Sequence, residues 1–144
     1  MTKGEKAKEL FESGYTCAQA VFLAFEEETG LDSTTAMKLL AGFGGGFGRL
    51  REVCGAASGM TAVISYLNSS GSVDDYENKR ELYKKIQSAM NEYKEINGSY
   101  ICRELLGGNI SSTPEPTKRS PDFYKKRPCS NLCAIAAEIA EKYI

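Results

Sequence analysis

The sequence predicts an all-α fold, a single helical bundle of about five to seven helices over residues 1–144. Apolar residues recur at helical spacing in most segments, and no alternation of apolar and polar residues persists as it would in a strand. The 144 residues are 42% hydrophobic and 26% charged, which suits one domain with its own core. A glycine-rich loop and a proline-rich basic excursion interrupt the predicted helices.

Helix start and stop signals divide the first forty residues into three segments. Gly14 and Gly30 are expected stops, because glycine readily adopts the conformation that ends a helix. Threonine, serine and aspartate are good N-caps, because their side chains accept hydrogen bonds from free backbone amides. The predicted helices cover residues 3–13, residues 16–29 with Thr16 as the N-cap, and residues from Asp32 or Ser33 to about Leu40.

Residues 41–49 contain five glycines in nine positions, which a helix would not tolerate at about 1 kcal/mol per glycine. The segment lacks the Gly-Lys-Ser/Thr ending of a P-loop, and a predicted helix rather than a strand precedes it. Its amides, helped by Arg49 and Arg51, can still form an anion nest. We interpret it as a loop that brings backbone close to a site near Cys54, with these candidate cofactor-binding residues: Gly44, Gly45, Gly46, Arg49 and Gly55.

The rest of the chain is also predicted to be helical, except for residues 114–128. That segment holds all four prolines and an excess of basic residues, which predicts an extended basic excursion. It is either a docking surface for an acidic partner or a solvated loop. The remaining predicted helices run from about Glu52 to Leu67, over residues 74–96, over residues 102–106, and from about Ser130 to the end.

The chain contains no histidine, and this absence excludes several kinds of chemistry. It rules out a Ser-His-Asp triad, a His-activated cysteine and any histidine metal ligand. The formal net charge of −1 gives no electrostatic reason to expect nucleic acid as a partner. A transition metal in this protein would therefore be held mainly by sulfur, and a nucleophile would be a thiolate.

The pattern of the N-terminus and of the apolar segments indicates a cytoplasmic protein. No apolar stretch follows the N-terminal lysines, and the longest uncharged apolar run, residues 53–67, is shorter than the roughly 20 residues that span a bilayer. We therefore expect no membrane association. In reducing cytoplasm the five cysteines favour metal ligands, redox thiols or packing residues over structural disulfides.

The five cysteines are dispersed, and none forms a Cys-x-x-Cys pair or a ferredoxin spacing. A site must therefore be assembled by the fold. Cys54, Cys102 and Cys129 are expected in first turns of helices, where free amides favour the thiolate. Cys133 shares a helical face with Cys129, four residues away, and is an additional candidate ligand. The alternative is that these cysteines are buried small hydrophobes, which suits Cys17 best.

Several ordered motifs resemble the redox-active family named for its C, GCAxxG, C, C cysteine pattern. They are Gly14-Tyr-Thr-Cys17-Ala-Gln-Ala-Val21, Gly42-Phe-Gly-Gly-Gly46, Val53-Cys-Gly-Ala-Ala-Ser-Gly59, Cys102-Arg-Glu-Leu-Leu-Gly107 and a late Cys129. The resemblance runs from about residue 5 to the end, and it departs at Val53-Cys-Gly, where the family label reads Gly-Cys-Ala. It implies a small helical protein with redox-active or metal-binding cysteines at four positions: Cys17, Cys54, Cys102 and Cys129. Related domains occur beside haem and iron–sulfur units in split-Soret-type cytochromes.

Three hypotheses follow. In the first, the four cysteines ligate an iron–sulfur cluster, [2Fe–2S] before others, or another thiolate-bound metal, for electron transfer with a redox partner protein. Zinc is a further metal that four thiolates can hold. In the second, the protein is metal-free and Cys54 forms a disulfide with another cysteine. In the third, the chain is a non-redox helical interaction module with packing cysteines. A homodimer is compatible with each of them.

Overall fold

The computed structural model describes residues 1–144 and confirms the all-α class. The only strand-type pairing is an isolated antiparallel bridge between Val53 and Ile101. The helical segments outnumber the five to seven predicted, because several are single turns. They are α1 (Lys3–Glu12), α2 (Cys17–Leu23), α3 (Glu26–Thr29), α4 (Ser33–Leu40), the 3₁₀ turn η1 (Ala41–Phe43), α5 (Gly44–Phe47), α6 (Gly55–Asn68), α7 (Tyr76–Asn97), α8 (Cys102–Leu105), α9 (Pro121–Lys126) and α10 (Cys129–Glu141).

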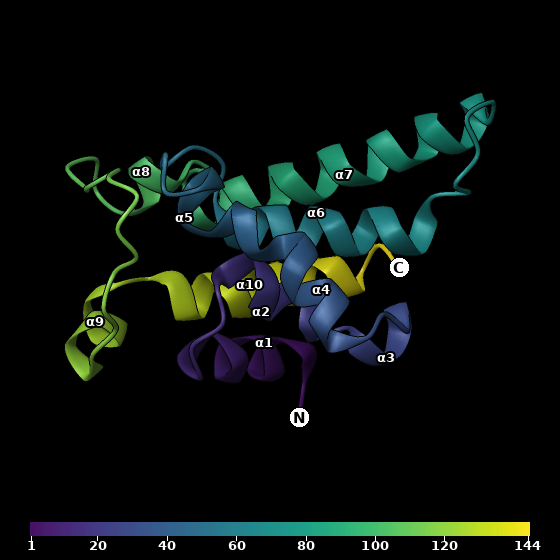
Figure 1. Ribbon diagram of the computed structural model, residues 1–144. Helices are drawn as coiled ribbons and strands as arrows, with labels where there is room; N and C mark the ends of the chain where they lie inside the picture. The colour runs from purple at the N-terminus through teal and green to yellow at the C-terminus, as the bar shows by residue number, and fades with distance from the viewer.

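The bundle is built around α2, α6 and α10, which pack against one another. Figure 1 shows α1 on one side of this centre and α7 on the other, with α7 lying along α6. The core is filled by side chains from all these helices. The largest fully buried ones are Tyr93, Phe22, Phe25, Leu40, Met60 and Ile64.

Small residues on α6 let α2 approach closely. A Cβ at Gly59 would lie 2.7 Å from the backbone oxygen of Ala18 and 3.0 Å from the Cβ of Val21. Ala56 and Ala57 beside it are fully buried. The scarcity of side-chain bulk after Cys54 thus serves close helix packing, and it fixes where the two helix starts lie relative to each other.

The helix starts follow their sequence signals. Thr16 caps α2 as predicted: its hydroxyl accepts from the Gln19 amide at 3.2 Å, and the Gln19 side chain accepts from the Thr16 amide at 3.0 Å. The same Gln19 side chain donates to the carbonyl of Met37 at 2.9 Å. One residue therefore caps α2 and also ties it to α4.

The predicted helix over residues 16–29 is in fact two helices, α2 and α3. The chain leaves helical geometry at Phe25, whose φ is −106° and ψ is 28°. This turn buries the Phe25 ring completely and leaves the three following glutamates exposed. Burial of the ring and solvation of the glutamates together favour the break over a continuous helix.

The helix predicted from about Glu52 begins later, at Gly55. The backbone before it pairs with a distant loop instead: the Cys54 amide donates to the Tyr100 carbonyl at 2.8 Å, and the Cys102 amide donates to the Glu52 carbonyl at 2.6 Å. These bonds satisfy groups that would otherwise belong to a first helical turn. Cys54 is therefore the N-cap of α6 and not a residue within its first turn.

The segment 114–128, predicted to be extended, contains the short helix α9. Ser120 caps it by accepting from the Phe123 amide at 3.2 Å, and Pro121 stands at its first position, where a missing N–H costs nothing. The Phe123 and Tyr124 rings pack against Phe11 of α1, with centroids 6.3 and 5.8 Å away. Aromatic packing thus holds the excursion against the bundle.

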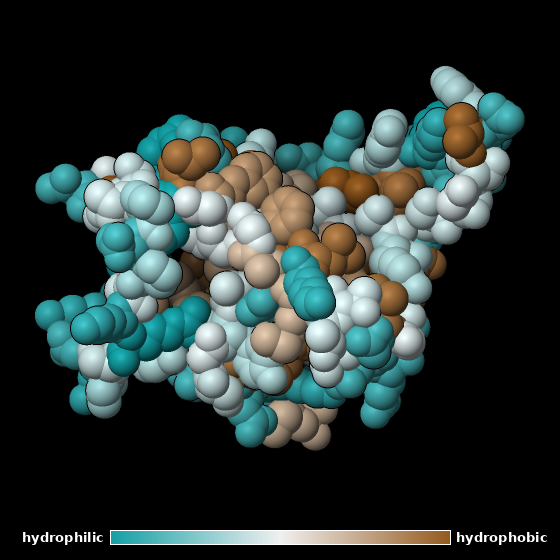
Figure 2. Space-filling view, viewed as in Figure 1, coloured by the Kyte–Doolittle hydropathy of each residue, from teal (hydrophilic) through white to brown (hydrophobic).

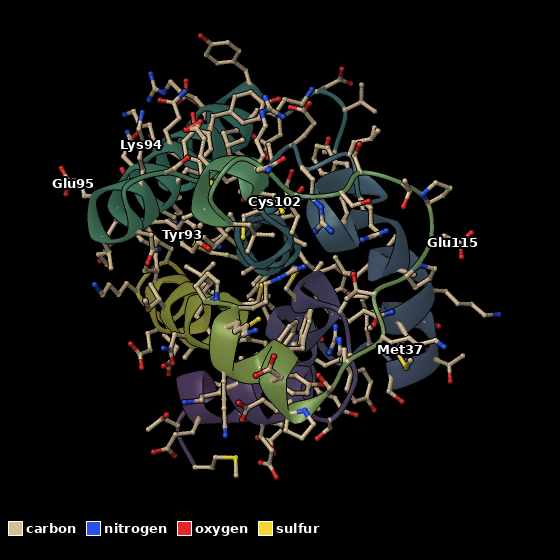
Figure 3. All side chains as sticks on the ribbon, turned by 90° about the vertical axis from the view of Figure 1, so that its left-hand side faces the viewer. Met37, Tyr93, Lys94, Glu95, Cys102 and Glu115 are labelled. Atoms are coloured by element: carbon tan, nitrogen blue, oxygen red, sulfur yellow. The ribbon has the colours of Figure 1, made fainter.

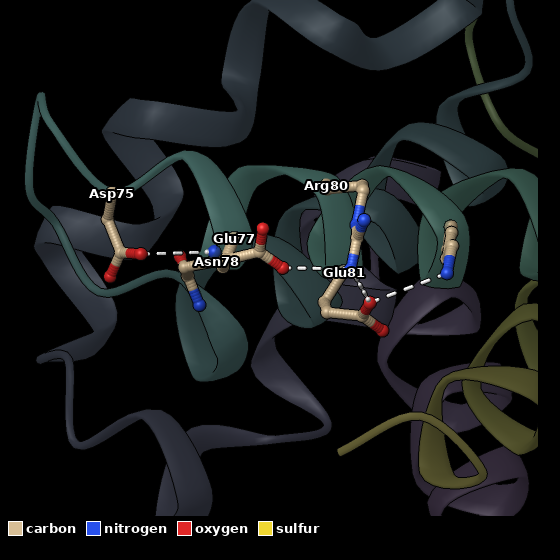
Figure 4. A network of polar contacts seen from close by, with 6 residues as sticks. Asp75, Glu77, Asn78, Arg80 and Glu81 are labelled. Atoms are coloured by element: carbon tan, nitrogen blue, oxygen red, sulfur yellow. Dashed lines mark hydrogen bonds and ion pairs between the residues drawn. The ribbon is translucent and has the colours of Figure 1, made fainter.

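The outer face of α7 is solvated and charged. Asp75 caps the helix by accepting from the Asn78 amide at 3.1 Å, and Arg80 lies between Glu77 and Glu81 at 2.8 and 3.6 Å (Figure 4). Exposed pairs of this kind are worth well under about 1 kcal/mol each, so they contribute little to stability. None of the helices has the combination of length and apolar composition needed to cross a bilayer.

Candidate functional site: a cavity lined by four cysteines

One end of the bundle is hollowed by an open cavity of about 520 Å³. In Figure 2 it is the recess at the left, with α5 and α8 above it and α9 below. Four of the five cysteines line it, and they are the four that match the sequence motifs: Cys17, Cys54, Cys102 and Cys129. Cys133 does not line it. Its sulfur is fully buried and contacts the Cys17 carbonyl oxygen at 3.8 Å.

Each of the four cysteines stands at the beginning of a helix. Cys17, Cys102 and Cys129 are the first residues of α2, α8 and α10, and Cys54 is the N-cap of α6. Helix N-termini carry free amides and partial positive charge, which favour an anion or a thiolate. Sequence reasoning placed three of the four at helix starts. It included Cys17 through the family resemblance and considered packing the alternative that suited this cysteine best, although the Thr16 capping signal beside it indicated the same position.

The glycine loop brings backbone close to the sulfurs, as the sequence predicted. Gly45 and Gly46 have φ values of 66° and 74°, and a Cβ at Gly46 would lie 2.8 Å from the Cys102 Cβ. A Cβ at Gly55 would overlap the Cys17 sulfur. Of the predicted cofactor-binding residues, Gly44, Gly45, Arg49 and Gly55 line the cavity. Gly46 lies behind Cys102 and does not line it.

Two of the cysteine sulfurs have polar partners. The Cys54 sulfur lies 3.2 Å from the hydroxyl oxygen of Tyr93, a fully buried residue of α7. The Cys102 sulfur lies 3.9 Å from Nη1 of Arg51. Figure 3 looks towards this end of the molecule, with Tyr93 and Cys102 towards the middle and the Glu115 side chain pointing outward. Tyr93 was not predicted as a site residue, and Arg51 was named only as support for an anion nest in the glycine loop.

Burial raises the pKa values of Cys17, Cys54 and Cys129, in the last case to about 11. Repulsion between neighbouring thiolates adds to the rise at Cys17 and Cys129. The Tyr93 hydroxyl and the amides of Ala57 and Ala56 lower the pKa of Cys54, but they do not offset its burial. For Cys54 and Cys129, the expectation that a helix start favours the thiolate is therefore wrong in the metal-free, reduced protein, because desolvation is the larger effect on their pKa values.

Arginines form the second component of the cavity. Arg49, Arg51, Arg119 and Arg127 all line it, and no aspartate or glutamate does. Only Arg49 was predicted as a site residue. Arg119 and Arg127 come from the basic excursion, which therefore contributes two of its cations to the cavity and does not present all of them to solvent. The run of basic residues was the signal in the sequence, but only the folded chain shows that Arg119 and Arg127 line the cavity.

Arg49 fastens the excursion over the cavity. Its guanidinium donates to the carbonyl of Thr113 at 2.5 Å, to the carbonyl of Glu115 and to the hydroxyl of Thr117 at 3.0 Å. Pro114, Pro116 and Thr117 thereby become part of the cavity wall. The Arg49 side chain thus holds the proline-rich segment against the cavity that the cysteines line.

The chemistry of the donors suits a sulfur-bound metal. Four thiols and no carboxylate line one cavity, and four thiolates are the usual complement of an iron–sulfur or zinc site. As they stand, no three metal-binding side chains are close enough together to hold an ion. All five cysteines are free thiols.

A family model described as "Putative redox-active protein (C_GCAxxG_C_C)" matches residues 15–143. The chain belongs to the C_GCAxxG_C_C family. The match covers all four cavity cysteines and the excursion between α8 and α10. Comparisons with curated proteins and with solved structures produced no match. The family description gives this C_GCAxxG_C_C protein a redox role and names no metal, substrate or partner.

Proposed function

We propose that this C_GCAxxG_C_C protein transfers electrons through a sulfur-ligated iron–sulfur cluster of the [2Fe–2S] type. Cys17, Cys54, Cys102 and Cys129 would be its ligands. The observation that carries the proposal is that these four sulfurs, and not the fifth, line a single cavity in a chain without histidine. A bound cluster would supply one-electron redox chemistry, and the partner would be a redox protein that exchanges the electron.

The chain's own residues would prepare this site in three ways. The helix starts and the cavity arginines would stabilise the negative charge of four thiolates. The Tyr93 hydroxyl would donate a hydrogen bond to the Cys54 sulfur, and such bonds tune cluster potentials. Ligation would also require the side chains to turn towards a common centre, because no three of them form a metal-binding group in the present arrangement.

The decisive experiment is anaerobic purification after expression with added iron, followed by a visible spectrum and by iron and acid-labile sulfide analysis. We expect a charge-transfer spectrum and iron and sulfide in equal amounts. Single alanine variants of Cys17, Cys54, Cys102 and Cys129 should lose most of the iron, whereas Cys133→Ala should keep it. A wild-type protein that contains no iron, sulfide or zinc and cannot be reconstituted would exclude the metal centre.

A metal-free thiol–disulfide function is the second candidate, because four free thiols line one cavity. Here Cys54 and a second cavity cysteine would lose two protons and two electrons to an oxidised disulfide partner, which is reduced to two thiols. Thiol titration before and after incubation with oxidised glutathione tests this function. A loss of two thiols, absent in Cys54→Ala, is the expected result. Five free thiols in both samples would contradict it.

A further inference from the structure

The cavity wall carries positive charge that no acidic side chain neutralises. It contains four arginines and no carboxylate, and none of the four forms an ion pair anywhere in the structure. One of the four, Arg51, is buried, and an unpaired buried charge is costly. In the metal-free, reduced protein no acidic side chain of the cavity offsets this charge, so the lining calls for an anion from outside the chain.

Arg51 has a free donor in a buried position. The residue is only 5% exposed, its Nε donates to the Ser111 carbonyl at 2.9 Å, and its Nη1 lies 3.9 Å from the Cys102 sulfur. Its Nη2 is buried and has no hydrogen-bond partner. Buried donors are almost always satisfied, so an orphaned guanidinium nitrogen on a cavity-lining residue marks the place of a missing acceptor.

The other three arginines divide into two groups. Arg49 is occupied by the excursion, and Arg119 donates to the Phe11 carbonyl at 2.7 Å while lying over the Phe11 ring. Arg127 lies over the Phe123 ring, 5.0 Å from its centroid, and makes no hydrogen bond through its side chain. Arg51 therefore has Nη2 left for a ligand, and Arg127 has a guanidinium group without any hydrogen bond.

We propose that the cavity binds a small anion carrying an oxyanion or carboxylate group, with Arg51 and Arg127 as its donors, beside the four cysteines. This inference rests on the proposed redox function in that it names the chemical class of the molecule that meets the redox centre. A volume of about 520 Å³ lies within the range of small-molecule sites. Arg127 can offer paired N–H donors to two oxygens at once, and Arg51 can add a single bond through its free Nη2.

The test is anaerobic titration calorimetry of the metal-free, reduced protein with phosphate, sulfate and acetate at constant ionic strength. We expect one anion site per chain for at least one of these probes. Phosphate or sulfate binding identifies an inorganic-oxyanion site, and binding of acetate alone identifies a carboxylate site. Arg51→Gln and Arg127→Gln should each weaken binding about ten-fold or more, the usual effect of losing a hydrogen bond to a charged group.

Arg80→Gln is the matched control, because it removes an exposed arginine of α7 that has no contact with the cavity. It should bind the probe as the wild type does. Circular dichroism checks that each variant is folded, and Arg127→Gln tests the proposal even when Arg51→Gln does not fold. No binding of any probe to the wild type, or full binding in both cavity variants, overturns the proposal.

Cys54→Ala separates this inference from the proposed function. A folded Cys54→Ala protein that cannot hold iron or form a disulfide should still bind the anion, because both proposed donors remain. If the wild type binds the anion but contains no metal and forms no disulfide, the redox proposal fails and the anion proposal stands. If the wild type binds no anion and Arg51→Gln loses iron, the anion proposal fails and the redox proposal stands. Arg51 would then support the metal ligands.

Discussion

The hydroxyl oxygen of Tyr93 lies 3.2 Å from the sulfur of Cys54, and Tyr93 has no exposed surface. This contact joins the C-terminal end of the long helix α7 to the start of α6 at the edge of the cysteine-lined cavity. Burial raises the pKa of Tyr93 well above its usual value, so the phenol keeps its proton. It is therefore available to donate to a thiolate at Cys54.

Tyr93→Phe should reduce the reactivity of Cys54 in the metal-free, reduced protein. The hydroxyl lowers the pKa of Cys54, so its removal raises that pKa further and leaves less thiolate at a given pH. Alkylation of Cys54 at pH 9, followed by mass spectrometry, should be several-fold slower. Tyr83→Phe is the control, because Tyr83 is an exposed residue of the same helix. Equal alkylation rates in both variants would contradict the role given to Tyr93.

The reduced, metal-free protein should lose stability above pH 9. Burial raises the pKa of Cys129 from 9.0 to about 11 in the folded state, so unfolding releases its proton between these pH values. Because the unfolded chain then binds fewer protons, the free energy of unfolding falls as pH rises, by about 2 kcal/mol for this group near pH 11. Urea unfolding at pH 8, 9 and 10.5 measures the effect. The slope should be smaller in Cys129→Ala, and an unchanged slope would contradict this assignment.

Gly59→Ala should destabilise the bundle by about 1–3 kcal/mol, because its new methyl group meets the Ala18 carbonyl and the Val21 side chain, and backbone cannot move aside easily. Gly42→Ala is the matched control, because a Cβ there meets nothing within 4 Å and the residue has no positive φ. Thermal unfolding compares the two. A Gly59→Ala protein as stable as the control would show that α2 and α6 have room to separate.

Cys133→Ala should weaken packing without affecting the cavity. Cys133 is fully buried in α10 and contacts the Cys17 backbone, so removing its sulfur should cost about 1 kcal/mol in unfolding free energy. Metal content, or the number of thiols lost on oxidation, should match the wild type. Loss of the metal in a folded Cys133→Ala variant would place this residue among the ligands.

Arg49→Gln should loosen the proline-rich segment. The substitution removes the guanidinium that bonds Thr113, Glu115 and Thr117, while the aromatic contacts of α9 remain. Endoproteinase Lys-C should then cleave after Lys118 several-fold faster than in the wild type, because cleavage requires local opening of the backbone. Arg103→Gln, which removes an exposed arginine paired with Glu52, should leave that rate unchanged. An unchanged rate in Arg49→Gln would show that the aromatic packing alone holds the segment.

Local signals in the sequence predicted the longer helices and several of their caps. Thr16 and Asp32 are N-caps and Gly30 is a C-cap as predicted, because a cap needs only neighbouring backbone groups. The breaks that were missed have distant causes. Phe25 leaves its helix to bury its ring, and the residues before Gly55 pair with the loop around Tyr100.

The sequence by itself determined that a transition-metal or redox site would be made mainly of sulfur, because the chain has five cysteines and no histidine, and its motifs singled out four of the five. Only the tertiary structure decided that those four helix starts meet at one cavity, that Arg51, Arg119 and Arg127 join them, and that burial keeps three of the thiols protonated. Capping and spacing act within a few residues of the chain. The burial of a thiol and the charges around it depend on residues that are far apart in the sequence, from 17 to 129, and only packing brings these residues together.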